Sequence, residues 1–224
     1  MNTRARLLRV LGNAFLGLAL GLVGYYGITS ILAACGQSAV SREFERFGGI
    51  AENSPTRIDV VPGAVLDFTG WETEDRAYWQ GLAPGAAFGR LVVPAMRLDV
   101  TVVKGVSVAD LKKGPGWVTY TDLPGPSGNC GISGHRTTYG APFRRLDALR
   151  PGDTIDLYSP YRRYRYVVDR TFSVTPDRSD VFDSTVRPTL TLTACHPPLS
   201  ARYRLVVVAS LDEVRRLADV RGQE

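Results

Sequence analysis

The sequence predicts an all-β domain, a closed barrel of seven or eight strands with short helices, preceded by one N-terminal transmembrane helix. Two observations carry this prediction. After about residue 89, short stretches of alternating apolar and polar residues, rich in β-branched side chains, are separated by glycine and proline turns. Near the N-terminus, residues 10–34 form one almost unbroken apolar stretch. Strands outnumber helices, and their hairpin-like spacing favours a single closed sheet.

The composition excludes several classes of protein. The chain has 224 residues, 44% hydrophobic and 22% charged, with 23 glycines and 14 prolines. These values do not fit collagen, a coiled coil, a multi-span membrane protein or a disulfide-dense mini-protein. The net charge of +5 is dispersed, without a Lys/Arg run or a basic stripe interleaved with aromatic residues. A nucleic-acid partner is therefore not expected, and the charge fits a surface that faces an anionic membrane or wall.

The apolar stretch of residues 10–34 is long enough to cross a membrane. At ~1.5 Å per residue it spans the ~30 Å hydrocarbon layer. Three arginines precede it, and no acidic residue occurs before Glu43. The positive-inside rule therefore predicts that residues 1–9 stay in the cytoplasm and that the rest of the chain is exported. The expected location is the cell membrane, in a single pass, with the following domain outside.

Three fates remain open for this segment. Its length favours an uncleaved signal anchor over a signal peptide, whose apolar core is ~7–15 residues long. Cleavage after a small-x-small site would instead release the domain. A third possibility comes from Leu32-Ala33-Ala34-Cys35-Gly36, which resembles a bacterial lipobox and would place a lipid on Cys35 after cleavage. All three fates put the bulk of the chain outside the cytoplasmic membrane.

The remaining chain divides by pattern. Residues 35–85 show poor periodicity and are expected to form a stem between the membrane and the domain. Alternatively, this segment contains a helix or strand that packs on the domain. The barrel domain is expected over residues 86–210 and a polar tail over residues 211–224. The expected strands are residues 91–93, 98–103, 129–133, 154–158, 164–174, 188–195 and 204–210. Short helices are expected over residues 106–113 and 141–149.

Cys195 is a candidate nucleophile. In the strand that ends at Cys195, the leucines and Ala194 share one face, while the threonines and the thiol share the other. Pro197 then stops the strand. A structural cysteine would belong with the leucines, so the thiol on the polar face indicates a nucleophile at the rim of a barrel. An inert, half-buried cysteine remains the alternative.

A cysteine nucleophile needs a basic or cationic neighbour to favour the thiolate. Of the two histidines, His196 directly follows Cys195 and would point to the opposite face of the strand. His135 lies in a loop after a strand, where catalytic groups are commonly carried. Arg202 and Arg204 precede the last strand, and either could donate hydrogen bonds to an oxyanion. A solvated histidine and ordinary surface arginines are the alternatives.

The other cysteines and the histidines give no sign of a cofactor. There are three cysteines in all, at positions 35, 130 and 195, and the latter two could pair or stay free. No Cys-x-x-Cys occurs and no Cys/His spacing resembles a zinc site. We therefore expect neither a metal nor another cofactor.

Four segments together resemble the sortases, closest to the class E housekeeping type of high-GC Gram-positive bacteria. They are GHRTTYGAPF at residues 134–143, LDALRPGD at 146–153, TLTACHP at 191–197 and SARYRLVV at 200–207. The order His, Cys, Arg and the spacing between them also match the family. The resemblance covers residues 86–210.

This resemblance implies an eight-stranded sortase barrel and a membrane-anchored cysteine transpeptidase. Such an enzyme cleaves an LAxTG- or LPxTG-like C-terminal sorting signal of a secreted protein after its Thr. It then transfers the acyl group to an amine of a peptidoglycan precursor. The family pattern places the nucleophile at Cys195, the general acid/base at His135 and the oxyanion-stabilising arginine at Arg204, with Arg202 as second choice.

The resemblance also implies substrate-binding roles for Ala194, Thr138 and Tyr139. Ala194 departs from the family pattern, which has Thr immediately before the nucleophile. The loss of that hydroxyl puts efficiency and signal preference in question. A catalytically weak or inactive wall-binding module is therefore an alternative, and a pilus-assembling sortase is another. A papain-like protease is disfavoured because its cysteine would precede its histidine.

Overall fold

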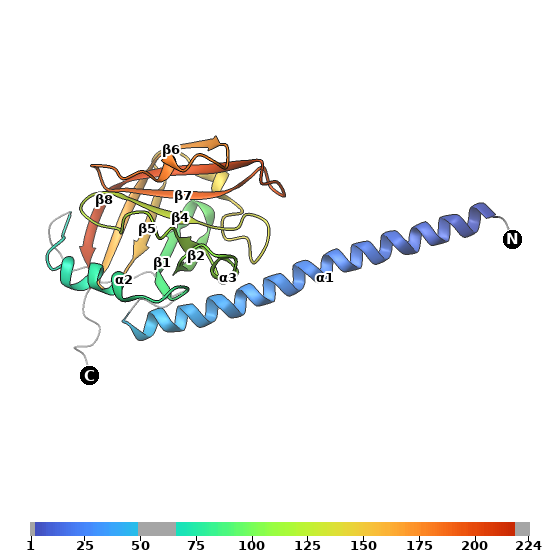
Figure 1. Ribbon diagram of the computed structural model, residues 1–224, viewed down its shortest axis with the longest axis horizontal. Coiled ribbons are helices and arrows are strands. Elements are labelled where there is room, and N and C mark those ends of the chain that lie inside the picture. Colours follow the sequence, from blue (N-terminus) through green and yellow to red (C-terminus); the bar gives the residue numbers. More distant parts are fainter. Residues whose placement is uncertain (1–2, 49–65, 218–224) are drawn as a thin grey trace.

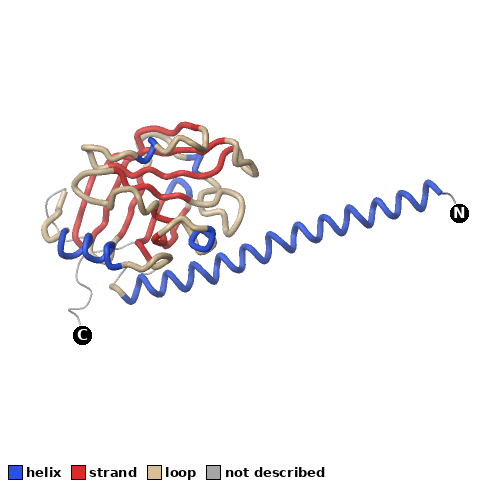
Figure 2. Tube along the Cα trace, in the orientation of Figure 1, coloured by secondary structure: helices blue, strands red, loops and turns tan. Residues whose placement is uncertain are grey.

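The computed structural model describes residues 3–48 and 66–217, and shows one β-barrel from which a single long helix departs (Figure 1, Figure 2). The barrel closes in the strand order β1-β2-β3-β4-β7-β8-β6-β5. The strands are β1 (Ala87–Val93), β2 (Leu98–Lys104), β3 (Gly116–Trp117), β4 (Asn129–Ser133), β5 (Thr154–Tyr158), β6 (Arg162–Val174), β7 (Thr189–His196) and β8 (Tyr203–Arg216). The predicted barrel is confirmed, with eight strands among the described residues.

The helices are few and mostly short. Besides the long α1 (Thr3–Arg46), they are α2 (Ala77–Gly81) and α3 (Val108–Leu111). A π-helical turn at Glu72–Arg76 leads into α2, and 3-10 turns lie at Pro94–Met96, Leu146–Ala148 and Asp180–Phe182. The helix expected over residues 106–113 shortens to α3, which begins at a capping box between Ser107 and Asp110.

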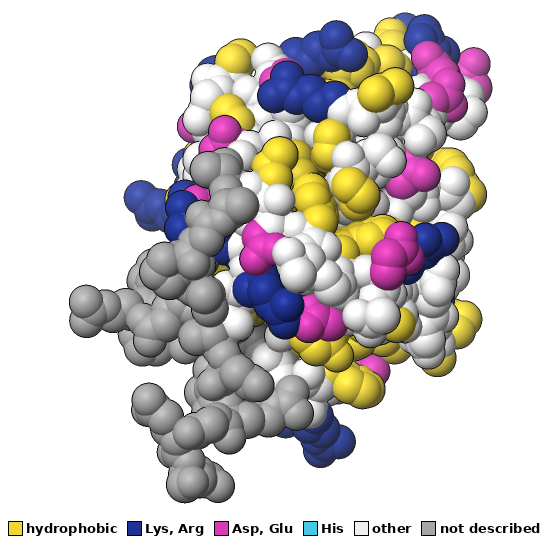
Figure 3. Space-filling view, turned by 90° about the vertical axis from the view of Figure 1, so that its left-hand side faces the viewer, with side chains coloured by type: hydrophobic (Ala, Val, Ile, Leu, Met, Phe, Trp, Pro, Cys, Tyr) yellow, Lys and Arg dark blue, Asp and Glu magenta, His cyan; other side chains and the backbone are white. Residues whose placement is uncertain are grey.

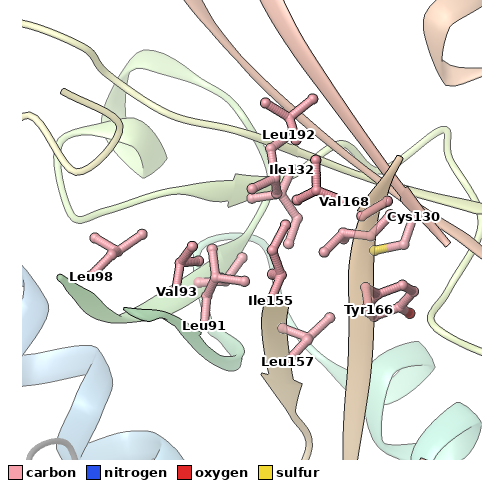
Figure 4. Packing of buried hydrophobic residues seen from close by; sticks show 14 of the residues in the cluster. Leu91, Val93, Leu98, Cys130, Ile132, Ile155, Leu157, Tyr166, Val168 and Leu192 are labelled. Atoms are coloured by element: carbon pink, nitrogen blue, oxygen red, sulfur yellow. The ribbon is translucent and has the colours of Figure 1, made fainter. Parts of the chain in front are cut away.

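The barrel interior is filled by the inward-facing residues of its strands (Figure 4). On β7, Leu190, Leu192 and Ala194 point into this core, as the alternation of the sequence predicts. Cys130 of β4 also lies there, close to Tyr166 of β6, and is fully buried. The opposite, outward face of β7 is therefore the threonine face.

Two segments differ from the sequence prediction. In place of a helix over residues 141–149 there is one 3-10 turn at Leu146–Ala148. Ala141, the first residue of the predicted helix, has a φ of 46°, which lies outside the helical region, so the helix does not begin there. Strand β8 runs on to Arg216, where the prediction placed a polar tail, because β6 pairs with it along its whole length. Residues 218–224 lie outside the described residues.

The region expected to be a stem is partly built into the domain. Residues 35–46 continue α1 without a break and pack on β1 and β2. Residues 66–85 lie along the barrel, and Trp79 of α2 enters its core. Arg162 of β6 forms an ion pair with Asp75, and both side chains are fully buried. Desolvation by burial raises the pKa of Asp75. Residues 49–65 lie outside the described residues.

Candidate active site

Cys195 lies near the end of β7, half-buried on its outward face. That face is polar and hydrogen-bonded to the neighbouring strand β4. Thr191 donates to the Asn129 side chain at 2.8 Å, and the hydroxyls of Thr193 and Ser133 are 2.7 Å apart. Thr191 and Thr193 thus both have hydrogen-bond partners on β4. The Cys195 thiol is the next side chain along the same face of β7.

Part of this outward face is covered by the connection between β6 and β7, residues 175–188. The Asn129 side chain donates to the carbonyls of Val181 and Asp183 at 3.0 and 3.2 Å. The Phe182 ring lies so close to Gly131 that an added Cβ there would stand 2.6 Å from it. Glycine at this position of β4 is required by that contact, and the covering segment lies over the start of β7 rather than over Cys195.

Arg204 is the direct cross-strand partner of Cys195. In the antiparallel pair β7–β8, Cys195 is paired with Arg204. Directly opposite residues share a face, with Cβ atoms about 4.5–5.5 Å apart. The Arg204 guanidinium is half-buried and donates to the carbonyls of Ala201 and Tyr203, both at 3.3 Å. Its position is therefore held by backbone acceptors beside the thiol.

Arg202 is placed differently. It precedes the first residue of β8, is exposed, and its guanidinium lies 5.4 Å from the centre of the Tyr203 ring. The strand alternation gives the two arginines the same parity, so only the resemblance to the family pattern favoured Arg204 in the sequence. The pairing register separates them, because only Arg204 has Cys195 opposite it.

His135 follows β4 by two residues. Strands β4 and β7 are parallel, with Ser133 beside Thr193. The amide of Gly134 donates to the Thr193 carbonyl at 3.0 Å and so extends the pairing past the end of β4. His135 and Cys195 each lie two residues beyond this last pair, Ser133 and Thr193, so both follow the same end of the β4–β7 pairing. No hydrogen bond joins the side chains of His135 and Cys195 within the part of the chain that the structure describes.

The surroundings of His135 are partly apolar. Its ring centre lies 5.3 Å from that of Tyr139, and its carbonyl accepts from the amide of Phe143 at 3.0 Å. The ring is half-buried, and this desolvation lowers its pKa from the ordinary 6.5. Burial therefore favours the neutral imidazole, the form that can accept a proton.

Arg136, His196 and Asp147 form a second set of polar groups beside the site, which was not predicted from the sequence. Arg136, next to His135, is 3% exposed. It contacts Nδ1 of His196 at 2.6 Å and forms a salt bridge with Asp147 at 2.8 Å. Since guanidinium groups only donate, Nδ1 of His196 accepts and its Nε2 carries the proton. Arg136 thus ties the loop that carries His135 to the strand end that carries Cys195.

The expected substrate-binding residues do not form one group. Ala194 is 3% exposed and lies in the barrel core, on the face opposite Cys195. Thr138 and Tyr139 are half-buried in the loop after His135, and the structure brings only Tyr139 against the histidine ring.

The other two cysteines are separate from this site. All three cysteines are free thiols. Cys130 is fully buried in the barrel core, and that burial raises its pKa well above the ordinary range, so it stays a protonated thiol. Cys35 is exposed on α1. The described residues contain no cluster of His, Cys, Asp and Glu that could hold a metal ion.

Two cavities flank the barrel. One, of about 600 Å³, lies on the outward side of β6, β7 and β8 under the 175–188 segment. Its lining includes Asn129, Thr189 and Thr191, so it opens on the same face of β7 as Cys195. The other, of about 440 Å³, lies between α1 and the barrel, and Tyr139 forms part of its wall.

Comparison with known proteins agrees with this geometry. The family model of the sortase domain matches residues 91–212, more than half of the chain. Sortase SrtE1 of Streptomyces coelicolor is 30% identical over 149 residues, which are 59% of this chain and 42% of that protein. The chain spans between 42% and 59% of the length of the first three curated relatives that it matches.

Solved structures give the same result. The crystal structure of sortase E1 from Streptomyces coelicolor, with a tripeptide in the active site, has a TM-score of 0.56 and 28% identity. It is matched over 61% of this chain and 94% of that one. Sortase E from Streptomyces avermitilis has a TM-score of 0.54 and 31% identity, over 60% of this chain and 93% of that one. These likenesses confirm the resemblance to class E.

Proposed function

This chain belongs to the sortase family of cysteine transpeptidases, and we propose that it is a membrane-anchored member that acts on sorting signals. The substrate is the C-terminal LAxTG- or LPxTG-like signal of a secreted protein, cleaved after its Thr. The acceptor is an amine of a peptidoglycan precursor. The observation that supports the proposal is the register that pairs Cys195 with Arg204 across β7 and β8, beside the β4 end from which His135 follows by two residues.

In the first half-reaction, the Cys195 thiolate attacks the carbonyl carbon of the Thr–Gly bond. The carbonyl oxygen becomes an oxyanion, and the Arg204 guanidinium, directly across the strand pair, donates hydrogen bonds to it. The C–N bond then breaks. His135 in its protonated form gives a proton to the leaving glycine amine, and a thioester between Thr and Cys195 remains.

In the second half-reaction, the acceptor amine attacks the thioester. The now neutral His135 takes a proton from that amine, and the Cys195 sulfur leaves as a thiolate. The lowered pKa of His135 suits this step, because a neutral imidazole is the available base at pH 7. It slows the first step, since the protonated form is then a minor population. Slow turnover follows from this balance.

The outward cavity on β7 supports binding of an extended peptide. It lies under residues 175–188 and is lined by threonines of the same face as Cys195. A peptide running along this face would present a carbonyl at the strand end, where the thiol lies. Thr138 and Tyr139 border the histidine side, and we assign them to contact with the substrate.

Helix α1 supports membrane anchoring. Among the described helices, it is the one that is long and apolar enough to cross a bilayer. Its large apolar side chains from Leu7 to Leu32 are exposed. With the positive N-terminus inside, the barrel lies outside the cytoplasmic membrane.

Mass spectrometry of the full chain with Leu-Ala-x-Thr-Gly and Leu-Pro-x-Thr-Gly peptides tests the proposal. An acyl adduct on Cys195 and cleavage between Thr and Gly are expected. Cys195→Ala should abolish both, whereas Cys130→Ala, a matched change of a buried thiol, should keep the chemistry. Cleavage by Cys195→Ala would overturn the assignment of the nucleophile.

A wall-binding module without chemistry is the second candidate. It is favoured by Ala194, which stands where the family has Thr, and by the absence of a Cys195–His135 hydrogen bond among the described residues. This candidate predicts no adduct with either peptide, although the protein would still bind cell walls.

A further inference from the structure

Helix α1 is joined to the barrel by a side-chain amide. Gln37 donates through Nε2 to the carbonyls of Thr101 and Lys113, at 2.8 and 2.7 Å, and accepts from the Thr101 amide at 2.9 Å. Two residues further along each segment, the Val103 amide of β2 donates to the Pro115 carbonyl at 2.9 Å. Thr101 and Lys113 therefore lie side by side just before β2 begins to pair directly with the segment after α3. The amide therefore fills a gap in the sheet, as a backbone peptide would.

Apolar packing completes the joint. Val40 and Phe44 of α1 form a buried cluster with Ala87 of β1 and Val103 of β2. At Gly36 a Cβ would stand 3.0 Å from the Lys113 backbone, so glycine allows the helix to approach this closely. The angle and the level at which α1 leaves the barrel are thereby fixed.

This joint places the barrel directly on the membrane surface. The first buried side chain of α1 is that of Thr29, followed by Ala33. The apolar residues 10–28, before the barrel begins to cover the helix, span roughly 28 Å at ~1.5 Å per residue. The hydrocarbon layer is ~30 Å thick. The part of the helix that the barrel does not cover is therefore about as long as the hydrocarbon layer is thick. As a result, the barrel surface next to Thr29 lies at the level of the lipid headgroups.

The cavity of about 440 Å³ lies at this level. Ser30, Ala33, Ala34 and Gln37 of α1 line one side of it. The barrel side carries the side chains of Arg97, Arg144 and Arg145, together with that of Lys113, whose ammonium donates to the Gly85 carbonyl at 3.0 Å.

The charge of this cavity is one-sided. Asp99 is the acidic residue in its lining, and it is engaged by Arg90 through bonds of 2.6 and 2.7 Å. Within residues 3–48 and 66–217, Arg97, Arg144 and Arg145 form no salt bridge. The face of the barrel turned away from the free end of α1 differs, because cationic and acidic side chains are interspersed there (Figure 3).

We propose that this cavity binds the phosphate of an anionic membrane lipid. The inference rests on the membrane anchoring in the proposed function. Guanidinium groups match phosphate oxygens with paired donors, and a cationic pocket beside a membrane helix attracts anionic headgroups. The apolar part of the wall, with Ala33, Met96 and Pro142, suits the glycerol and the start of an acyl chain. A free inorganic phosphate would leave that part without a partner.

The lipid would also lie near the reaction centre. Tyr139 lines the cavity with one side and its ring lies 5.3 Å from the His135 ring. Lys112 approaches the same Tyr139 ring at 5.6 Å. A bound headgroup would therefore hold the loop after His135 against the membrane surface.

The test uses the full chain in a neutral detergent, titrated with dioctanoyl phosphatidylglycerol, dioctanoyl phosphatidylcholine or inorganic phosphate and followed by native mass spectrometry. Phosphatidylglycerol should bind tightest. Arg144→Gln with Arg145→Gln should weaken its binding by roughly ten- to thirtyfold, from the contribution of two basic residues near a lipid surface. The matched pair Arg170→Gln with Arg187→Gln, outside the cavity lining, should change it by less than about twofold.

Three outcomes would overturn the proposal: equal binding of the two lipids, inorganic phosphate binding as tightly as phosphatidylglycerol, or equal losses in both double variants. Carbonate extraction of membranes keeps this result separate from the proposed function. A chain that resists extraction but shows no lipid preference refutes the lipid site alone. A chain that is extracted refutes the membrane anchor itself.

Discussion

Replacement of Arg136 by Met should loosen the candidate active site, because Arg136 touches both halves of it. The side chain is 2% exposed and holds Nδ1 of His196 at 2.6 Å and Asp147 at 2.8 Å. Met keeps much of the volume and removes both bonds. The variant therefore tests whether this link positions the loop of His135 relative to the end of β7.

The size of the effect follows from the two bonds. A hydrogen bond to a charged group is worth about 1.5–3 kcal/mol, which applies to the shielded contact with His196. Asp147 is 58% exposed, so its salt bridge adds only about 0.2–1 kcal/mol. The free energy of unfolding should fall by about 2–4 kcal/mol, which lowers Tm by roughly 5–15 °C. A displacement near 1 Å at the site costs up to ~100-fold in rate, so kcat should fall about 10- to 100-fold.

The assay measures kcat and KM with a sorting peptide well below the lowered Tm, so that the variant is folded. We expect kcat to fall and KM to change little. Asp147→Asn is the matched control, since it removes only the charge of the exposed partner and should cost little in either quantity. A nitrogen NMR spectrum should show Nδ1 of His196 without a proton in the wild type.

The reasoning is refuted if Arg136→Met loses stability as expected but keeps the wild-type kcat. Arg136 would then stabilise the fold without positioning the reacting groups. Equal loss of kcat in Asp147→Asn would show that the contact with Asp147, and not the one with His196, positions the loop.

The remaining predictions concern the other site residues. Arg204→Lys should lose most activity because a point charge cannot replace the guanidinium fork, while Arg202→Ala should keep most of it; peptide cleavage rates decide, and the reverse order would move the role to Arg202. Ala194→Thr should lower the free energy of unfolding by about 1–3 kcal/mol, since a hydroxyl in the core lacks a partner; a gain in kcat/KM instead would place Ala194 in contact with substrate. In a proton NMR titration of the two histidines, the signal that disappears in His135→Gln should titrate below pH 6.5, because burial lowers the pKa of His135. As the unfolded chain then binds the proton more readily, this histidine should reduce stability as the pH falls below 6.5; a titration above 6.5 would contradict the desolvation argument.

Most of the strands could be predicted because their alternation directly reports which face is buried. Residues 129–133 and 154–158 form strands with the predicted bounds. The two-residue β3 was missed, since so short a segment has no periodicity. The helix predicted over residues 141–149 was wrong: Phe143, Leu146 and Leu149 are all buried, but they follow the positive φ of Ala141 on turns and one 3-10 turn. The spacing of buried residues along the chain does not distinguish a helix from a series of turns.

The site was predicted in part by the same means. The alternation on β7 put Cys195 on the polar face, and the structure places it there. Arg136 was missed, although its position next to His135 could have drawn attention to it. A buried cation is visible only when its distant partners, here His196 and Asp147, are in place. Gln37 gave no signal at all, because its role depends on the backbones of Thr101 and Lys113, which come together only in the fold.

Neighbours along the chain were enough to establish what each residue can do and which face of its own element it occupies. The thiol on a threonine face, the apolar span near the N-terminus and the barrel of short strands all follow from such local patterns. The pairing of Arg204 opposite Cys195, the contacts of Arg136 with His196 and Asp147, and the contact of α1 with the barrel at Gln37 emerged with the folded structure alone. Those outcomes depend on the register between strands, and register is fixed by the packing of residues far apart in sequence.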